Sequence, residues 1–160
     1  MTNAYERLGA AGYQFYEVSN ASRPGKHSRH NSAYWTGLPY VGLGPAAHSF
    51  DGRARRWNVP AWEAYRTAIA AGKSPIESEE TLTDDQRELE RLYLGLRTSA
   101  GLPLAACPPA SASESFRDRV SAWVAAGWAE IAGERVSLRP TGWLVLDALV
   151  RDLTGPARVA

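Results

Sequence analysis

The sequence has very little cysteine, since Cys107 is the single one among 160 residues. One cysteine excludes an internal disulfide, and it excludes a multi-cysteine zinc or iron–sulfur site built by this chain alone. The sequence also lacks an apolar run near the roughly 20 residues that span a bilayer. Its first residues lack the basic and then apolar build of a signal peptide. We therefore expect a cytoplasmic protein with no transmembrane segment.

An excess of charge of either sign is missing too. The formal net charge is +1, and residues 1–80 carry 9 basic and 7 acidic groups against 9 and 10 in residues 81–160. Nucleic-acid binding usually needs a strong basic excess, so we expect no nucleic-acid partner. The 44% hydrophobic and 22% charged residues are ordinary for a globular protein. The length fits one domain, or one small domain plus a piece of another.

The first half of the chain contains few periodic segments. The pattern predicts a helix over 4–11, an unpaired edge strand over 13–18, an extended segment over 38–41 and a helix over 61–71. Residues 19–30 have the composition of a loop, and residues 73–80 that of an acidic linker. We expect this linker to separate two structural units.

The second half is more regular. Thr83 and Gln86 have the spacing of a capping box, which predicts a helix running to about Thr98. After a loop come a helix over 115–126, a hairpin of strands 128–131 and 135–138, and a helix over 141–153. We therefore expect an α+β chain whose residues 81–160 form a winged-helix-like domain.

Residues 29–49 concentrate the rare side chains. They contain His30, His48, the Tyr34-Trp35 pair and a glycine-rich turn. Histidine is a common haem and metal ligand, aromatic rings offer flat faces, and glycines allow close backbone approach. The mixture suits a flat, partly polar ligand. The alternative is structural: His30 and Asn31 cap backbone in a turn, and the aromatic pair fills the core.

Several motifs occur together in a recognisable order. They are Tyr16-Glu17-Val18-Ser19-Asn20, Arg23-Pro24-Gly25, His30-Asn31-x-x-Tyr34-Trp35, Gly42-x-Gly44-Pro45-x-Ala47-His48-Ser49, Arg56-x-Asn58 and Leu94-Gly95-Leu96-Arg97-Thr98. Together they resemble the C-terminal portion of the oxygen-independent coproporphyrinogen III oxidase family of radical S-adenosylmethionine proteins. The His-Asn-x-x-Tyr-Trp signature is similar to that of the haem-chaperone, HemW-like, branch.

The resemblance implies a particular architecture. Family members have a partial barrel that holds a 4Fe–4S cluster and S-adenosylmethionine, covered by a smaller C-terminal domain. Residues 1–50 would then be the last helix and strand of that barrel, carrying the motifs described above. Residues 51–80 would be a connecting helix and linker, and residues 81–160 the winged-helix-like domain.

Two departures from the family pattern matter. The three cluster cysteines are absent, so this chain alone cannot hold the cluster or cleave S-adenosylmethionine. We expect either a fragment or a chain that works with a separate barrel partner. The second departure is that Ala21 and Ser22 stand between Asn20 and Arg23, where relatives usually have Phe-Ala. Because this loop lies near the S-adenosylmethionine pocket in relatives, Ser22 is a candidate for cofactor contact.

The resemblance also implies a haem site in the chaperone branch. His30 would supply an axial nitrogen to the iron, Asn31 would orient the loop, and Tyr34 and Trp35 would pack on the macrocycle. His48 is a second candidate ligand, although its setting also suits a turn held by hydrogen bonds. His27 is expected to face solvent. Cys107-Pro108 resembles a haem-regulatory dipeptide, which is common by chance, and no role is assigned to it.

Three functions follow from these features. The first is a haem-binding chaperone module that passes haem to an acceptor protein. The second is the covering domain of an oxidase that decarboxylates two propionates of coproporphyrinogen III by radical chemistry. The third is a winged-helix DNA-binding protein. The third is disfavoured because Arg117 and Arg119 are balanced by Glu114 and Asp118.

Overall fold

The computed structural model describes residues 2–106 and 110–154. The chain divides into two compact units. Residues 1–36 and 89–160 form what we call the main unit, and residues 37–88 form the sheet unit. Cys107 and Pro108 lie outside the described residues.

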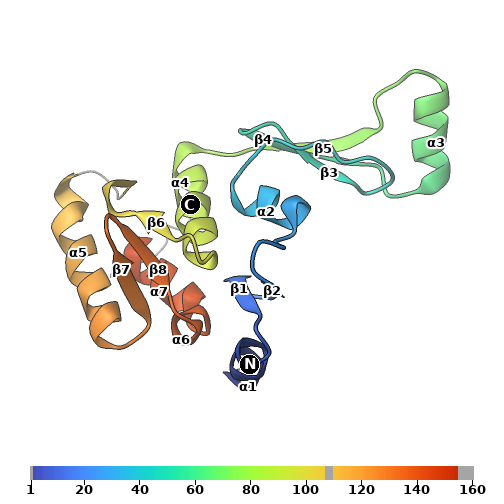
Figure 1. Ribbon diagram of the computed structural model, residues 1–160. Helices are drawn as coiled ribbons and strands as arrows, with labels where there is room; N and C mark the ends of the chain where they lie inside the picture. Colours follow the sequence, from blue (N-terminus) through green and yellow to red (C-terminus); the bar gives the residue numbers. More distant parts are fainter. Residues whose placement is uncertain (1, 107–109, 155–160) are drawn as a thin grey trace. The chain divides into compact units, whose positions relative to one another are not determined.

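The main unit is a mixture of helices and short strands (Figure 1). Its elements are α1 (Thr2–Ala10), β1 (Gln14–Glu17), β2 (Asn20–Ser22), α2 (Arg29–Trp35), most of α4 (Asp84–Arg97), β6 (Leu102–Pro103), the 3-10 helix η1 (Leu104–Ala106), α5 (Ala110–Ala125), β7 (Ala129–Ala132), β8 (Arg135–Leu138), α6 (Pro140–Trp143) and α7 (Leu146–Thr154). The strands β6, β8 and β7 form a sheet in that order, and all of its pairings are antiparallel. Helix α5 packs against β7.

One hydrophobic core joins both sequence segments of the main unit. It contains Leu92 and Leu96 of α4, and it continues through α5, β7, β8, α6 and α7. Tyr5 of α1 belongs to the same cluster, and Phe15 and Val18 pack against it. Burying side chains of this size contributes roughly 1.5–3 kcal/mol each. The N-terminal residues therefore share the core of the C-terminal segment.

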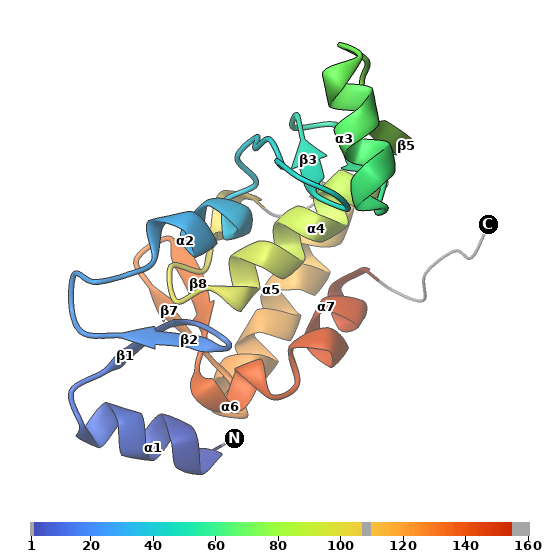
Figure 2. The same ribbon diagram turned by 90° about the vertical axis from the view of Figure 1, so that its right-hand side faces the viewer.

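Two predictions for the N-terminal residues were wrong. Strand β1 is not an unpaired edge, because it forms an antiparallel hairpin with β2 in residues expected to be loop, next to α1 (Figure 2). The end of the predicted loop, Arg29 and His30, is also not loop but the start of the helix α2. Ser28 starts this helix, since its hydroxyl accepts a hydrogen bond from the Asn31 amide at 3.2 Å.

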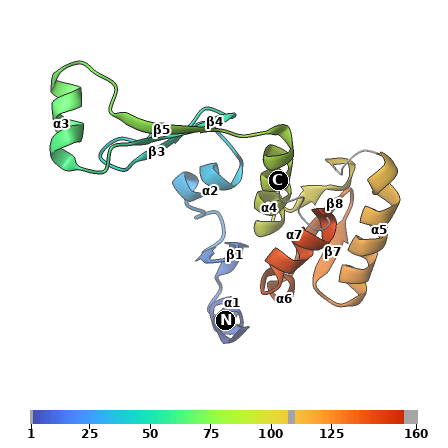
Figure 3. The same ribbon diagram turned by 180° about the vertical axis from the view of Figure 1, so that it is seen from behind.

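The sheet unit is a three-stranded antiparallel sheet with one helix at its end (Figure 3). Strand β4 (Ala54–Asn58) lies between β3 (His48–Phe50) and β5 (Ile76–Thr81), and α3 (Trp62–Ala70) connects β4 to β5. The acidic stretch predicted as a linker is mostly strand β5. Its glutamates pair with arginines across the sheet, with Arg55 opposite Glu80 and Arg56 opposite Glu79.

The predictions for the second half of the chain agree better with the structure. The capping box is confirmed. The backbone N–H of Gln86 donates to the Thr83 hydroxyl at 3.2 Å, and the backbone N–H of Thr83 donates to Gln86 Oε1 at 2.8 Å. The hairpin is confirmed as β7 and β8. The last predicted helix is two helices, α6 and α7. Among the described residues, no helix is long and apolar enough to cross a bilayer.

Candidate functional site

Helix α2 carries the His-Asn-x-x-Tyr-Trp motif on two turns. Its N-terminus is capped by Ser28, and the Ser32 amide donates to the Ser28 carbonyl at 2.9 Å. At the other end the Thr36 hydroxyl donates to the Ala33 carbonyl at 3.0 Å. A helix of seven residues has little stability of its own, so its position depends on side-chain contacts with the rest of the main unit.

The exposed face of α2 presents His30 and Tyr34, which are one helical turn apart. Their rings meet edge to face with 5.1 Å between the centroids. The Tyr34 hydroxyl lies 3.4 Å from His30 Nε2. This distance is longer than that of a well-formed hydrogen bond, so the imidazole nitrogen is weakly held.

Trp35 lies toward the interior of the main unit. The guanidinium carbon of Arg97 lies 4.5 Å from the centre of its ring, the geometry of a cation–π contact. The indole Nε1–H is buried and has no acceptor among the described residues. Trp35 is therefore the side chain that fixes α2 to the end of α4.

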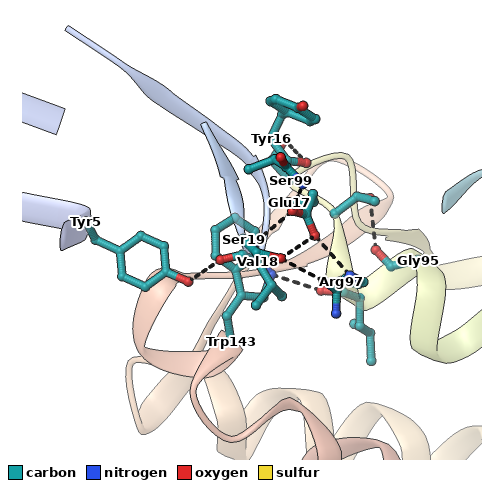
Figure 4. Close-up of polar contacts among 12 residues, drawn as sticks. Tyr5, Tyr16, Glu17, Val18, Ser19, Gly95, Arg97, Ser99 and Trp143 are labelled. Atoms are coloured by element: carbon teal, nitrogen blue, oxygen red, sulfur yellow. Dashed lines mark hydrogen bonds and ion pairs between the residues drawn. The ribbon is translucent and has the colours of Figure 1, made fainter. Parts of the chain in front are cut away.

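Arg97 is itself held by a buried carboxylate (Figure 4). Glu17 is fully buried, and its Oε2 lies 2.9 Å from Arg97 Nε. Its Oε1 accepts from the Ser19 amide at 2.8 Å and from Asn20 Nδ2 at 2.5 Å. Arg97 Nη2 donates to the Ser19 hydroxyl at 2.9 Å. A buried carboxylate is tolerated only when it is paired and hydrogen-bonded, and this one is both.

Backbone contacts join the same elements. The Val18 amide donates to the Arg97 carbonyl at 3.2 Å, and the Ser99 amide donates to the Tyr16 carbonyl at 3.0 Å. The Tyr5 hydroxyl donates to the Val18 carbonyl at 2.7 Å. Burial raises the pKa of Tyr5, the charge of Glu17 raises it further, and Arg97 opposes the shift. The sequence motifs contained Glu17 and Arg97, but no role was predicted for either residue.

The remaining candidate residues lie in different places. Asn31 is half-buried in the first turn of α2, where its amide is capped. Ser22 lies on β2, and its hydroxyl donates to the Arg23 carbonyl at 3.0 Å. His27 is exposed, as predicted, but its ring stacks on Tyr16 at 4.5 Å. His48 belongs to the sheet unit, and its part in a haem site with α2 stays a prediction.

The glycine-rich loop before His48 is a turn held by hydrogen bonds. Asn58 is buried, and its Nδ2 donates to the Gly44 carbonyl at 2.9 Å. The Gly44 amide donates to the Tyr65 hydroxyl at 3.1 Å. A Cβ on Gly42 would lie 2.2 Å from the His48 carbonyl oxygen, so this position requires glycine. His48 itself is exposed on β3, opposite Trp57.

Comparisons with known proteins agree with the motifs. Residues 82–145 match a family model described as the HemN C-terminal domain. The heme chaperone HemW of Mycobacterium tuberculosis is 40% identical over 149 residues, which are 93% of this chain and 37% of that protein. The chain resembles the C-terminal portion of proteins of the HemN and HemW family. HemW of Bacillus subtilis is 34% identical over 96 residues, 60% of this chain and 25% of that protein.

The fold agrees with a member of the same family. The solved structure of coproporphyrinogen III oxidase (HemN) from Escherichia coli, described as a radical SAM enzyme, has a TM-score of 0.60 at 15% identity. The match covers 95% of this chain and 39% of that one. This likeness establishes the mixed helix and sheet fold. The chain spans little more than a third of the length of the M. tuberculosis protein and of the E. coli enzyme.

Among the described residues, no group of three or more His, Cys, Asp and Glu side chains has an arrangement that could hold a metal ion. Haem iron is different, because the porphyrin supplies four nitrogens and the protein needs to supply only one axial ligand. The exposed imidazole of His30 fits that requirement, since its described polar contact is the long one to Tyr34.

Proposed function

We propose that this chain is the haem-binding portion of a HemW-like haem chaperone, which receives haem and passes it to an acceptor protein. The observation that carries the proposal is the 40% identity to a protein named heme chaperone, over nearly the whole chain. The exposed position of His30 on α2 supports it further. Haem is the cargo in this proposal, and binding and release require no chemistry by the chain.

His30 supplies the axial nitrogen in this proposal. The Tyr34 hydroxyl moves away from Nε2 when iron binds, at small cost because the contact at 3.4 Å is weak. Tyr34 then packs its ring on the macrocycle, and Asn31 holds the first turn. Trp35 acts through the position of α2, since its ring lies under Arg97. His48 is the candidate for a second contact with haem.

The surrounding architecture is proposed from the same family. Residues 1–50 would be the edge of a radical S-adenosylmethionine barrel, residues 51–80 a connecting segment, and residues 81–160 a winged-helix-like domain. The order α4, β6, α5, β7 and β8, with β6 and β7 on either side of β8, supports the last part. A partner barrel would hold the 4Fe–4S cluster and S-adenosylmethionine, with Ser22 near the latter. We also place the protein in the cytoplasm.

The second candidate function is the covering domain of an oxygen-independent coproporphyrinogen III oxidase. The fold likeness to the E. coli enzyme favours it, although 15% identity carries the fold alone. The two functions depend on different parts of the ligand. A chaperone that ligates iron needs the metal, whereas an oxidase domain recognises the porphyrin carboxylates and the ring.

A pair of titrations separates these functions. The purified chain is titrated with haem and with metal-free coproporphyrin III, which is a stable probe for the oxidised substrate ring. The chaperone proposal predicts a Soret shift with haem and binding at least about tenfold weaker for the metal-free ring. Equal binding of the two probes would contradict iron ligation and favour the oxidase reading.

A further inference from the structure

A cavity lies beside α2, lined by Ser32 and Trp35 and not by His30. It has a volume of about 360 Å³ and lies wholly within the main unit. Ser32 and Trp35 of α2 line it together with Tyr16, His27, Ser99 and Arg135. This volume is at the lower end of small-molecule sites, and it suits a ligand of one or two rings.

One wall of the cavity is flat and aromatic. The rings of Tyr16 and His27 stack with 4.5 Å between the centroids and an angle of 19° between the planes. His27 is exposed on its outer side, while Tyr16 is buried in β1. Because the two rings cover one another, the face that stays open is that of the exposed His27, and a flat ring face favours a planar ligand because two flat surfaces exclude water over the largest area.

Most side-chain donors of the cavity are already used. The hydroxyls of Thr36, Thr98 and Ser99 already donate to backbone carbonyls, at 3.0, 3.1 and 3.3 Å. The indole N–H of Trp35 is left without an acceptor within the described residues, and its nitrogen has almost no accessible surface. A buried donor without an acceptor costs about 1–3 kcal/mol, so a ligand acceptor that the indole ring turns to meet would be favoured.

Arg135 supplies the charge. Its Nε donates to the Ala100 carbonyl at 2.8 Å and its Nη2 to the Gly101 carbonyl at 2.7 Å, which fixes the guanidinium. Carbonyl oxygens carry no net charge, and no ion pair joins Arg135 to an acid in the described part of the chain. Within the described residues the positive charge of Arg135 is therefore uncompensated, and Arg135 is the one lysine or arginine that lines the cavity. It matches one carboxylate better than a doubly charged phosphate.

We propose that this cavity binds a small planar carboxylate, whose acid group meets Arg135 and the Trp35 N–H and whose ring lies on the Tyr16 and His27 wall. The site is distinct from the haem site, since the cavity is lined by Ser32 and Trp35 of α2 and by the residues after α4, and not by His30. It does not rest on the proposed haem function.

The test is an NMR titration of the chain labelled with ¹⁵N at tryptophan. The probe is benzoate, and benzamide is its neutral control of the same shape. With benzoate we expect a saturable shift of the Trp35 indole resonance, which is assigned with Trp35→Phe. Benzamide should bind at least about tenfold more weakly. Equal binding of the two probes, or no saturable shift with benzoate, would overturn the proposal.

Four variants sharpen this test. Arg135→Gln removes the charge and is expected to weaken benzoate binding about tenfold or more, while Arg135→Lys keeps the charge and most of the affinity. Arg139→Gln is the matched control, because Arg139 is exposed and paired with Glu130 outside the cavity. Equal loss in Arg135→Gln and Arg139→Gln would contradict the site. His30→Ala should leave benzoate binding unchanged, so failure of the haem proposal and failure of this one are distinguishable.

Discussion

Arg97 lies between Glu17 and Trp35: its Nε is 2.9 Å from the Glu17 carboxylate, and its guanidinium carbon is 4.5 Å from the centre of the Trp35 ring. The arginine thus neutralises a fully buried acid with one part of its guanidinium and packs on the candidate haem-binding helix with its face. The stability of β1 and the position of α2 depend on the same side chain.

We expect Arg97→Met to lower the free energy of unfolding by about 3–5 kcal/mol, because it leaves the Glu17 charge buried without a partner. Urea unfolding followed by circular dichroism measures the loss. The double variant Glu17→Gln with Arg97→Met should recover part of this loss, since no isolated charge remains. If the two single changes were additive in the double variant, the pair would not be coupled.

Loss of the capping box of α4 should lower the free energy of unfolding by a smaller amount. Thr83→Ala removes the hydroxyl that accepts from the Gln86 amide, and it should cost about 1 kcal/mol. Hydrogen exchange of the amides in the first turn of α4 reports the change locally. Thr83→Ser keeps the acceptor oxygen and serves as the control, so equal exchange in both variants would argue against the cap.

Two glycines with similar backbone conformations should respond very differently to substitution. Gly101 and Gly133 have φ of 62° and 59°, so alanine is strained at both. At Gly101 a Cβ would lie 2.1 Å from the Val136 carbonyl oxygen, whereas at Gly133 nothing lies within 4 Å. We expect Gly133→Ala to cost about 1 kcal/mol and Gly101→Ala to cost at least about 2 kcal/mol more. Thermal unfolding of both variants tests the difference.

Asp51 should stay ionised far into the acid range. Its carboxylate accepts from the Ala54 amide at 2.8 Å, from Arg56 at 2.7 Å and from the Arg53 amide at 2.9 Å, which lowers its pKa from 3.8 to about 2. The folded pKa is the lower one, so the stabilisation is complete above about pH 4 and is lost as the pH falls through about 2. A pH titration of the Asp51 carboxyl ¹³C resonance by NMR measures this pKa. Arg56→Gln should raise the pKa only in part, because the Ala54 hydrogen bond remains.

The sequence predicted those elements whose signals are local. The helix after Thr83 and the hairpin around Gly133 have cap and turn residues at fixed spacings, and both are present. Strand β5 was missed because all six of its residues are exposed, so it shows no alternation. Helix α2 was missed because it has no buried residue, although Ser28 offered a cap signal.

The candidate site divides in the same way. The residues of the His-Asn-x-x-Tyr-Trp motif could be singled out from their chemistry, but their placement on two sides of a helix needed the structure. His30 and Tyr34 share the exposed face, while Trp35 contacts Arg97. The pairing of Glu17 with Arg97 joins residues far apart in the chain, and no local pattern marks such a pair.

The haem titration of wild type, His30→Ala and His48→Ala, followed by absorbance in the Soret region, tests the central claim most directly. His48 is the comparison within the chain, because it is also exposed but lies on β3 of the sheet unit and is the candidate only for a second contact with haem. We predict that His30→Ala loses the Soret shift and weakens haem binding about tenfold or more, with a smaller change in His48→Ala. An unchanged spectrum and affinity in His30→Ala would contradict the assignment of His30 as the iron ligand.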